Sequence, residues 1–349
     1  EFANTSLSPT LLTRLSPFTK GEPYNASLIA DYQKKLISTG FFTEIQVQPS
    51  NIKAPTNHQI PISVHYILTN LWSEHLMLGY DTDEGATFMA SITRNHLNTW
   101  GVQWNNTLHL SEQQYLFSSE LRIPKTHPLR DFYLINIEAN RELLEPSGHS
   151  DALALRASYH IQHTLKSHII KSIYRLNLTL ERSKSDNSSI EEQWRPFFYP
   201  DWHLSYTSTP TKDFVIDFSS QISGILPPLA PDPFFRVLNK INLLWKPNTQ
   251  YRLLSRVQLG YLFTSENADP LPLSWYFRAG GMNSIRGFAY HSLGNEVLYT
   301  NTQLATAGVE LQREIIQSIF GTIFFGIFEI VQIFSVTNSP SVPSPLVMA

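Results

Sequence analysis

The chain contains no cysteine among its 349 residues, so neither disulfide bonds nor thiol chemistry contribute to its fold or function. Charged residues make up only 16% of the sequence, against ~25% in ordinary proteins, although hydrophobic residues stand at an ordinary 42%. This combination is unusual for a soluble enzyme and fits a protein whose apolar residues are spread through alternating strands. The net charge of −3 gives no electrostatic basis for a nucleic-acid partner.

The chain also opens without a secretion signal, because EFANTS has neither a basic start nor an apolar core. We therefore expect either a protein that is not exported or a mature or partial chain. A single segment, Ile315 to Phe334, approaches a membrane-spanning helix in length and hydrophobicity. Its polar residues, among them Gln317 and Glu329, and its two glycines make it a poor one.

Sequence motifs of common catalytic sites are missing as well. There is no Gly-x-Ser-x-Gly elbow, no phosphate-binding loop and no dinucleotide fingerprint. His160 and His163 fall on opposite faces of a strand by parity, so they cannot bind one metal ion together. The acidic turn Asp81, Asp83 and Glu84 could hold calcium, but a hairpin turn explains it more simply. We therefore expect no enzyme activity, no metal and no cofactor.

Residues 1–70 predict a small α+β unit. A helical spacing of apolar residues runs from Asn25 to Thr39 and is followed by alternating segments at Phe41–Gln48 and Ile60–Leu68. The apolar positions of the helix are Leu28, Tyr32, Leu36 and Ile37. A helix and a strand pair are too little for an independent core, so we expect a further strand upstream.

From Glu74 onward the sequence alternates with a period of two. In Asp151–Leu165, for example, odd positions such as Leu153 and Leu155 are apolar, whereas even positions such as Arg156 are small or polar. These runs are longer than ordinary strands of about five or six residues, and a bilayer needs about 9–11 tilted residues per strand. Long alternating strands with aromatic ends are typical of a transmembrane β-barrel. A soluble β-sandwich, the alternative, would have shorter strands and more Lys and Glu on its polar face.

The pattern predicts about thirteen strands, the last two near Asn301–Glu314 and Gly321–Phe334. Bacterial single-chain barrels have even numbers of strands. The Ser/Pro-rich tail, 337–349, does not resemble a membrane strand. We therefore expect a partial barrel over residues 71–336 in a chain that is incomplete at both ends. Because missing strands leave two open edges in lipid, we expect this polypeptide not to insert stably.

A long loop, residues 264–300, separates two of the strand-like runs. Its centre, WYFRAGGMNSIRGFAYHSLG, is rich in aromatic and anchoring residues, which argues for a folded loop instead of a disordered one. Gly280 and Gly281 allow backbone conformations closed to other residues, and Gly287 follows Arg286. A guanidinium offers five donors, so a folded loop that presents Arg286 predicts a carboxylate or carbonyl partner. An exposed loop arginine is the simpler alternative.

Several segments resemble the BamA/TamA superfamily of outer-membrane protein assembly factors, whose barrels have 16 strands. AGGMNSIRGF, at 279–288, is similar to the superfamily's loop signature Gly-Gly-x-x-Ser-Val/Ile-Arg-Gly-Phe/Tyr. The matching residues are Gly280, Gly281, Ser284, Ile285, Arg286, Gly287 and Phe288. Three further segments resemble TamA-like members: GYDTDEG at 79–85, FFYPDWHLSYTST at 197–209 and AGVELQREI at 307–315.

The resemblance implies that Arg286 points into the barrel lumen, where a buried charge requires an acceptor. Glu310 is one candidate, because it shares lumenal parity with Thr306 and Gln312. Glu329 is the other, since FEIVQ stands where the superfamily has Phe-x-Asp-x-Gly. Val331 in place of the glycine is a departure that could crowd the loop.

The segment from Pro17 to Pro49 resembles a POTRA domain. It carries a proline-phenylalanine pair, a Gly-x-Pro-Tyr turn, an amphipathic helix and a glycine-aromatic-phenylalanine strand entry. The residues of the turn and the edge are Gly21, Pro23, Tyr24, Gly40 and Phe42. POTRA domains bind extended segments by adding a strand to their sheet edge. A plain spacer domain is the alternative.

The resemblance as a whole implies a TamA-like factor of the Gram-negative outer membrane, with its POTRA domain in the periplasm. Such factors insert or secrete β-barrel clients, autotransporters included, without ATP. A client strand would pair with the first barrel strand, near His75–Thr82. The implied partners are the lipid bilayer, the clients and a TamB-like inner-membrane protein. The alternatives are BamA itself, a two-partner secretion transporter and, from another class, a passive outer-membrane channel.

Overall fold

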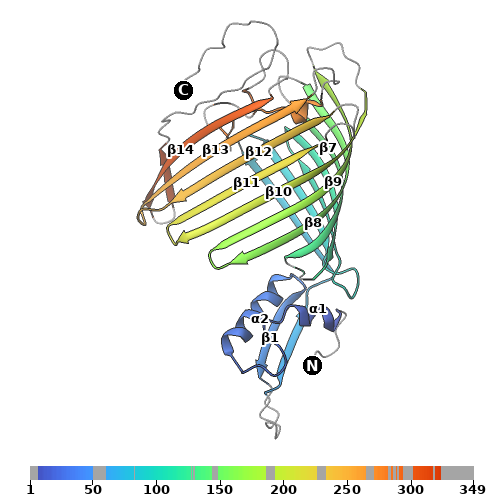
Figure 1. Ribbon diagram of the computed structural model, residues 1–349, viewed down its shortest axis with the longest axis vertical. Coiled ribbons are helices and arrows are strands. Elements are labelled where there is room, and N and C mark those ends of the chain that lie inside the picture. Colours follow the sequence, from blue (N-terminus) through green and yellow to red (C-terminus); the bar gives the residue numbers. More distant parts are fainter. Residues whose placement is uncertain are drawn as a thin grey trace.

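The computed structural model describes most of the chain, and the predicted tail and Glu329 lie outside the described residues. The described residues are 7–49, 60–81, 83–126, 128, 130–143, 148–185, 193–225, 233–264, 271–281, 284–285, 288, 291–293, 302–316 and 319–323. They form a small N-terminal α+β unit and a large curved antiparallel sheet (Figure 1).

The N-terminal unit packs two helices on a two-stranded antiparallel sheet. Its elements are α1 (Pro9–Arg14), α2 (Ala26–Ser38), β1 (Phe42–Pro49) and β2 (Ile62–Leu68). The Asn25 side chain accepts a hydrogen bond of 2.9 Å from Ser27 N and so caps α2. The Tyr32 hydroxyl donates to Leu12 O at 3.0 Å, and burial raises the pKa of this phenol to about 12.

The predicted apolar face of α2 is partly wrong. Ile29 joins Tyr32 and Leu36 in the core, whereas Ile37 is 50% exposed. The face is rotated because α1 also packs on the helix through Leu11 and Leu12, so α2 contacts more than the strand pair beneath it. The sequence patterns that predicted α2 and the strands did not predict α1.

The main sheet holds thirteen strands among the described residues, in chain order and each antiparallel to the next. Its strands are β3 (Trp72–Asp81), β4 (Gly85–Arg94), β5 (Gln103–Leu110), β6 (Gln114–Pro124), β7 (Asp131–Leu143), β8 (Gly148–Leu165), β9 (His168–Ser185), β10 (Arg195–Thr211), β11 (Phe214–Ile225), β12 (Phe234–Trp245), β13 (Tyr251–Thr264), β14 (Gln303–Ile316) and β15 (Ile319–Ile323). The predicted antiparallel sheet is thereby confirmed. In the described part of the chain, β3 and β15 do not pair with each other, so the sheet is open.

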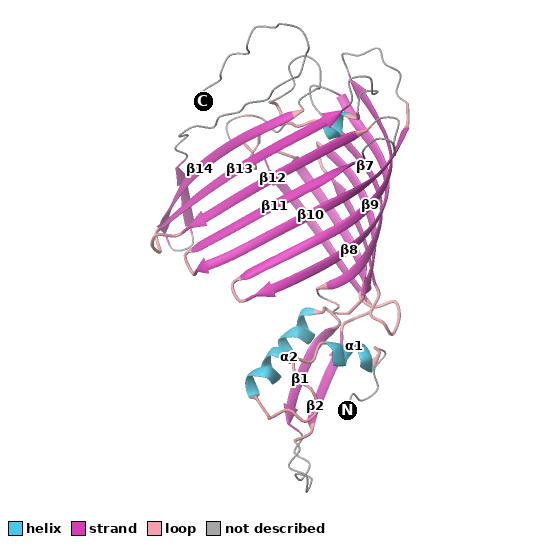
Figure 2. Ribbon diagram, viewed as in Figure 1, coloured by secondary structure: helices cyan, strands magenta, loops and turns pink. Residues whose placement is uncertain are grey.

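The sheet curves around a lumen, and its strands slope across the wall (Figures 1 and 2). Of the segment Ile315–Phe334, whose sequence would make a poor membrane-spanning helix, residues 315–316 lie in β14 and residues 319–323 in β15. No helix within the described ranges is long and apolar enough to cross a membrane.

The two faces of the sheet differ as the alternation predicts. On the outer face of β8, Leu153 is 48% and Leu155 46% exposed. On the inner face of β9, Asn177 and Thr179 are buried, and Glu181 is only 4% exposed. Exposed apolar side chains on one face and polar side chains on the other are typical of a barrel wall between lipid and an aqueous lumen.

The N-terminal unit contacts one end of the sheet, here named the domain-proximal end. Arg14 Nη1 donates to Lys125 O at 2.8 Å, and Ser8 N donates to Thr99 O at 2.7 Å. Gly101 has a φ of +74°, and a Cβ on it would lie 2.8 Å from the Phe41 ring and 2.9 Å from Leu11. The turns β4–β5 and β6–β7 therefore lie against the N-terminal unit, while the turn β3–β4 and the loop β13–β14 lie at the domain-distal end.

Replacing Leu155 with arginine tests the placement of the outer face. We expect Leu155→Arg to destabilise the full-length protein in lipid vesicles by about 2–4 kcal/mol, because it places a charge in the middle of the hydrocarbon layer. Leu165→Arg, at the end of the same strand, should cost at most about 1 kcal/mol. Urea unfolding in vesicles measures both, and equal costs would contradict a membrane-spanning β8.

Candidate functional site

The candidate site is the loop between β13 and β14, which folds back against the inner face of the sheet. Its described part begins at Leu271 and contains a short 3-10 helix, η1 (Leu273–Trp275). Figure 2 shows η1 inside the curve of the sheet, near the domain-distal strand ends. Trp275 is 8% exposed and makes the central contact with the wall.

Aromatic side chains of the wall enclose the Trp275 ring. Its centroid lies 5.7 Å from that of Phe197, 4.8 Å from that of Tyr199 and 4.5 Å from that of Phe234. The contact with Phe234 is nearly perpendicular, at 88°, which is a favoured geometry for aromatic pairs. These wall residues come from β10 and β12, so one loop residue ties two strands together.

Glu181, on the inner face of β9, accepts the loop's polar donors. Trp275 Nε1 donates to Glu181 Oε2 at 3.1 Å, and Ser274 Oγ donates to Glu181 Oε1. Ser150 Oγ of the neighbouring strand β8 donates to the same Oε1 at 2.6 Å. A buried carboxylate is costly unless it is hydrogen-bonded, and these donors meet that requirement while fixing η1 on the wall.

A second set of contacts fixes the residues after η1. Arg236 Nε, on β12, donates to Trp275 O at 3.1 Å, and its Cζ lies 4.8 Å from the centroid of the Phe277 ring. Phe277 packs on Gly260 of β13, where a Cβ would lie only 2.7 Å from the ring. Gly260 therefore forms a notch in the wall that admits the aromatic side chain.

The glycine-rich signature follows these anchored residues and contains a tight turn. Gly280 and Gly281 have φ values of +112° and +91°, which favour glycine. Gly281 N donates to Phe288 O at 3.0 Å, so the segment doubles back on itself. Ile285 is 1% exposed and packs into a cluster with Leu271, Trp275, Phe277 and Ala279 of the loop and Phe197, Phe234, Leu262 and Leu304 of the wall. Ser284 lies within the turn, and Arg286 and Gly287 lie outside the described residues.

The loop also contacts the turn between β3 and β4. A Cβ on Gly281 would lie 2.8 Å from Asp83 Oδ2, so a larger residue would displace the Asp83 carboxylate. Asp83 belongs to GYDTDEG, and the loop signature and the first hairpin are thus neighbours in space although about two hundred residues separate them. Glu84 of the same turn lies 3.3 Å from His109 Nε2. No cluster of metal-binding side chains occurs in the portion of the chain that is described.

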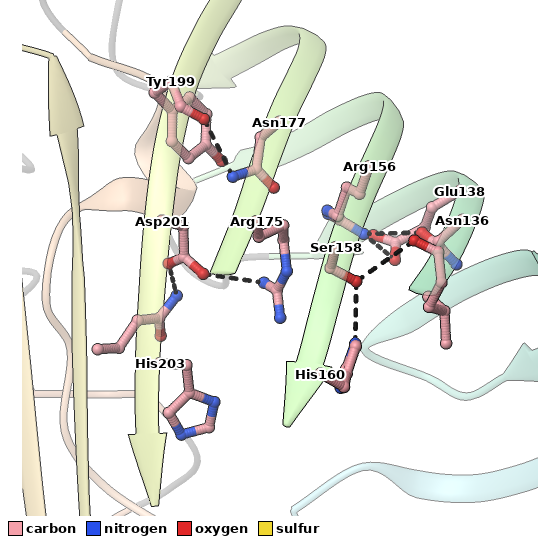
Figure 3. A network of polar contacts seen from close by, with 12 residues as sticks. Asn136, Glu138, Arg156, Ser158, His160, Arg175, Asn177, Tyr199, Asp201 and His203 are labelled. Carbon is pink, nitrogen blue, oxygen red and sulfur yellow. Dashed lines mark hydrogen bonds and ion pairs between the residues drawn. The ribbon is translucent and has the colours of Figure 1, made fainter. Parts of the chain in front are cut away.

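The inner face of β7 to β11 carries a network of charged side chains (Figure 3). Arg156 pairs with Glu138, and Arg175 Nη1 lies 3.4 Å from Asp201 Oδ1. Gln221 Nε2 donates to Asp201 Oδ2 at 2.8 Å. A cavity of about 220 Å³ between this network and η1 is lined by both. The lumen beneath the loop is therefore polar, and two of its arginines, Arg156 and Arg175, are paired with carboxylates.

The predicted acceptors of Arg286 have different outcomes. Glu310 is buried on the inner face of β14, as its parity predicts, and forms an ion pair with Arg256 of β13. The contact of Arg286 with Glu310 or Glu329 stays a prediction, because Arg286 and Glu329 lie outside the described residues. Sequence reasoning did not find Glu181. Its parity placed it in the lumen, but only the fold shows which lumenal carboxylate faces the loop.

One histidine of the loop is held neutral. Burial, and after it the charge of Arg278, lowers the pKa of His291 to about 4. Its Nδ1 lies 3.8 Å from Glu142 Oε1. At neutral pH the imidazole therefore adds no charge to the docked loop.

An antiparallel sheet with an apolar outer face, a polar inner face and a loop docked inside defines a class: outer-membrane β-barrels with a lumenal loop. Residues 56–326 match the Omp85 superfamily domain, and the chain belongs to this superfamily. The match places the chain among outer-membrane barrels.

Solved structures share this fold. BamA from Haemophilus ducreyi lacking POTRA domains 1–3 superposes with a TM-score of 0.68 at 15% identity, over 88% of this chain and 65% of that one. CdiB from Escherichia coli gives 0.59 at 12% identity, over 96% and 65%. CdiB from Acinetobacter baumannii gives 0.51 at 12% identity, over 91% and 67%. The chain thus spans about two thirds of the length of these proteins.

Removing the indole donor tests the Glu181 contact. We expect Trp275→Phe to keep the aromatic packing but leave Glu181 with one donor fewer, weakening loop docking by about 1–3 kcal/mol. Hydrogen exchange at residues 271–281 should then rise. Trp245→Phe, on the exposed outer face of β12, is the matched control and should leave exchange in the loop unchanged. Equal protection in both variants would contradict the anchoring role.

Filling the notch at Gly260 tests the Phe277 contact. Gly260→Ala puts a methyl group where the ring lies, and overpacking of this kind costs about 1–3 kcal/mol. The loss should appear as faster proteolysis of the loop in an otherwise folded barrel. The double variant Gly260→Ala with Phe277→Leu makes room for the methyl group and should recover part of the protection. Additive losses in the double variant would show that the two residues are not coupled.

Proposed function

We propose that the chain is the barrel part of a TamA-like factor that inserts or secretes β-rich proteins at the Gram-negative outer membrane. The observation that carries this proposal is the edge of β3, which pairs with β4 alone among the described residues and leads into the turn that the docked loop contacts. The alternatives within the superfamily are a BamA and a two-partner secretion transporter. The similarity of GYDTDEG, FFYPDWHLSYTST and AGVELQREI to TamA-like members favours the first.

The edge of β3 is suited to pairing with another strand. In the described part of the chain β3 pairs with β4 alone, and Leu76 and Leu78 are 78% and 82% exposed. An unpaired backbone group in hydrocarbon costs several kcal/mol. A client strand that pairs with β3 removes this cost for both partners, so insertion needs no ATP. Autotransporter barrels are the client class that we propose.

The docked loop would keep this edge in place. Its contact between Gly281 and Asp83 supports the first hairpin from inside the lumen. We propose that Arg286 completes the docking by pairing with a lumenal carboxylate, for which Glu310 and Glu329 are the candidates. The wall would then keep its curvature while the edge accepts a client.

The N-terminal unit fits the role of a POTRA domain in the periplasm. Gly21 and Gly40 have φ values of +97° and +74°, Pro23 and Tyr24 are exposed at the turn, and Phe42 is buried where β1 begins. Among the described residues, β1 and β2 pair only with each other. Their open edges could receive an extended client segment or a TamB-like inner-membrane partner.

Cysteine cross-linking tests the pairing at β3. The 349 residues contain no cysteine, so a single substitution gives one thiol within them. Met77 of β3 and Met89 of β4 are direct cross-strand partners, but β4 also pairs with β5. In the full-length protein, Met77→Cys should form a disulfide with a cysteine in the last strand of an autotransporter barrel during insertion into liposomes. Met89→Cys, the matched control, should form about tenfold less, because cross-linking requires neighbouring strands with Cβ atoms about 4.5–5.5 Å apart.

Two outcomes would contradict the proposal. Equal cross-linking at both positions would mean that clients do not pair with β3. Steady ion conductance in planar bilayers, together with no client insertion, would indicate a passive channel.

A further inference from the structure

The outer face of the sheet carries an apolar furrow that the proposed function does not use. It crosses the strands from β6 to β12 and has a volume of about 820 Å³, within the range of small-molecule sites. An aromatic row forms one side of it. The strand register sets these side chains opposite one another in order: Tyr133, Tyr159, Tyr174 and Trp202.

Small residues form its floor. Ala157 and Pro200 lie in the adjacent row of the outer face, on either side of Leu176. Gly224 continues this row, and a Cβ on it would lie 2.4 Å from Phe234 O. The wall is thus hollowed where these small residues stand beside large aromatic side chains.

The furrow rises from the domain-proximal end into the membrane. Tyr133 lies close to the start of β7 at Asp131, which is at the domain-proximal end. Trp202 lies well inside β10, far from the domain-proximal end of that strand at Thr211. One end of the furrow is therefore at the membrane surface and the other in the hydrocarbon layer.

Positively charged side chains lie at the end of the furrow that is at the membrane surface. Lys125 follows β6, and its Nζ lies 3.2 Å from Tyr159 Oη and 4.3 Å from the centroid of that ring. The hydrogen bond to Tyr159 is the first cause that raises the pKa of this ammonium, which is therefore charged at neutral pH. Arg14 of α1 brings a guanidinium to the same place by donating to Lys125 O. Asp131, 3.9 Å from the ammonium, offsets one of the two charges.

We propose that the furrow binds an anionic phospholipid of the leaflet nearest the N-terminal unit, with an acyl chain in the furrow and the phosphate at Lys125 and Arg14. The surroundings of the furrow indicate a lipid, because the outer face of a barrel is covered by lipid. The charges of Lys125 and Arg14 indicate an anionic lipid, because a basic group at the mouth of an apolar site is complementary to a lipid phosphate. Since Arg14 belongs to α1 and Lys125 to the barrel, the bound lipid joins the two units.

Native mass spectrometry of the full-length protein with dioleoyl phosphatidylglycerol tests this site. Lys125→Glu should retain about fivefold to tenfold less lipid, the effect expected of one basic residue near an anionic surface. Ala157→Phe should also retain less lipid, because its ring fills the furrow. Lys166→Glu, an exposed lysine in the turn β8–β9, is the control for charge. Ala307→Phe, on the outer face of β14, is the control for volume. Heat-modifiable migration on a gel shows that each variant is folded.

Retention that is equal in the wild type and in both furrow variants would overturn the site. Equal retention of dioleoyl phosphatidylcholine by the wild type would overturn its selectivity for an anionic lipid. A dimer in detergent that Ala157→Phe dissociates would assign the furrow to a second copy instead. None of these readouts depends on client insertion, so the failure of this proposal is distinguishable from the failure of the proposed function.

Discussion

The structure depends on the requirement that backbone N–H and C=O groups in a hydrocarbon layer be hydrogen-bonded within the protein. Antiparallel pairing of chain neighbours satisfies it, and this is the topology from β3 to β15. An open edge of the sheet in lipid raises the free energy of the protein, because the backbone groups along it lack hydrogen-bond partners. Pairing at an edge is therefore favourable for any strand of suitable sequence, whether it belongs to the same chain or to another.

The polar lumen follows from the same alternation. A residue that follows a lipid-facing one must face inward, so lumenal carboxylates such as Glu181 and Asp201 are removed from lipid by parity alone. Removed from lipid, they still require partners. Asp201 finds Arg175 and Gln221 on neighbouring strands, whereas Glu181 finds two of its donors in the loop and a third, Ser150, on β8. The docked loop is in this sense part of the polar interior of the wall.

The sequence correctly predicted the elements that have a short repeating pattern of apolar residues. The alternating run Asp151–Leu165 lies entirely within β8, because a period of two acts on every residue of a strand. It erred on α2, where the register of the buried face depends on α1, and it did not find Glu181, whose role depends on a loop ninety residues away. The unusual backbone conformations of Gly280 and Gly281 were predicted because positive φ is a local property. The partner of Arg286 could not be predicted from local properties, since it requires the three-dimensional arrangement of β14 and the strand after it.

The contact between Gly281 and Asp83 links the two features on which the proposed function depends. If this contact holds the first hairpin in position, the hairpin must by thermodynamic reciprocity stabilise the docked loop to the same extent. A client strand that pulls β3 outward must therefore work against the loop's contacts with Glu181, Arg236 and Gly260. These contacts lie on β9, β12 and β13, far from the edge, so they resist the movement without blocking access to it. In the proposed function, the edge would then accept a strand while the remainder of the wall keeps its shape.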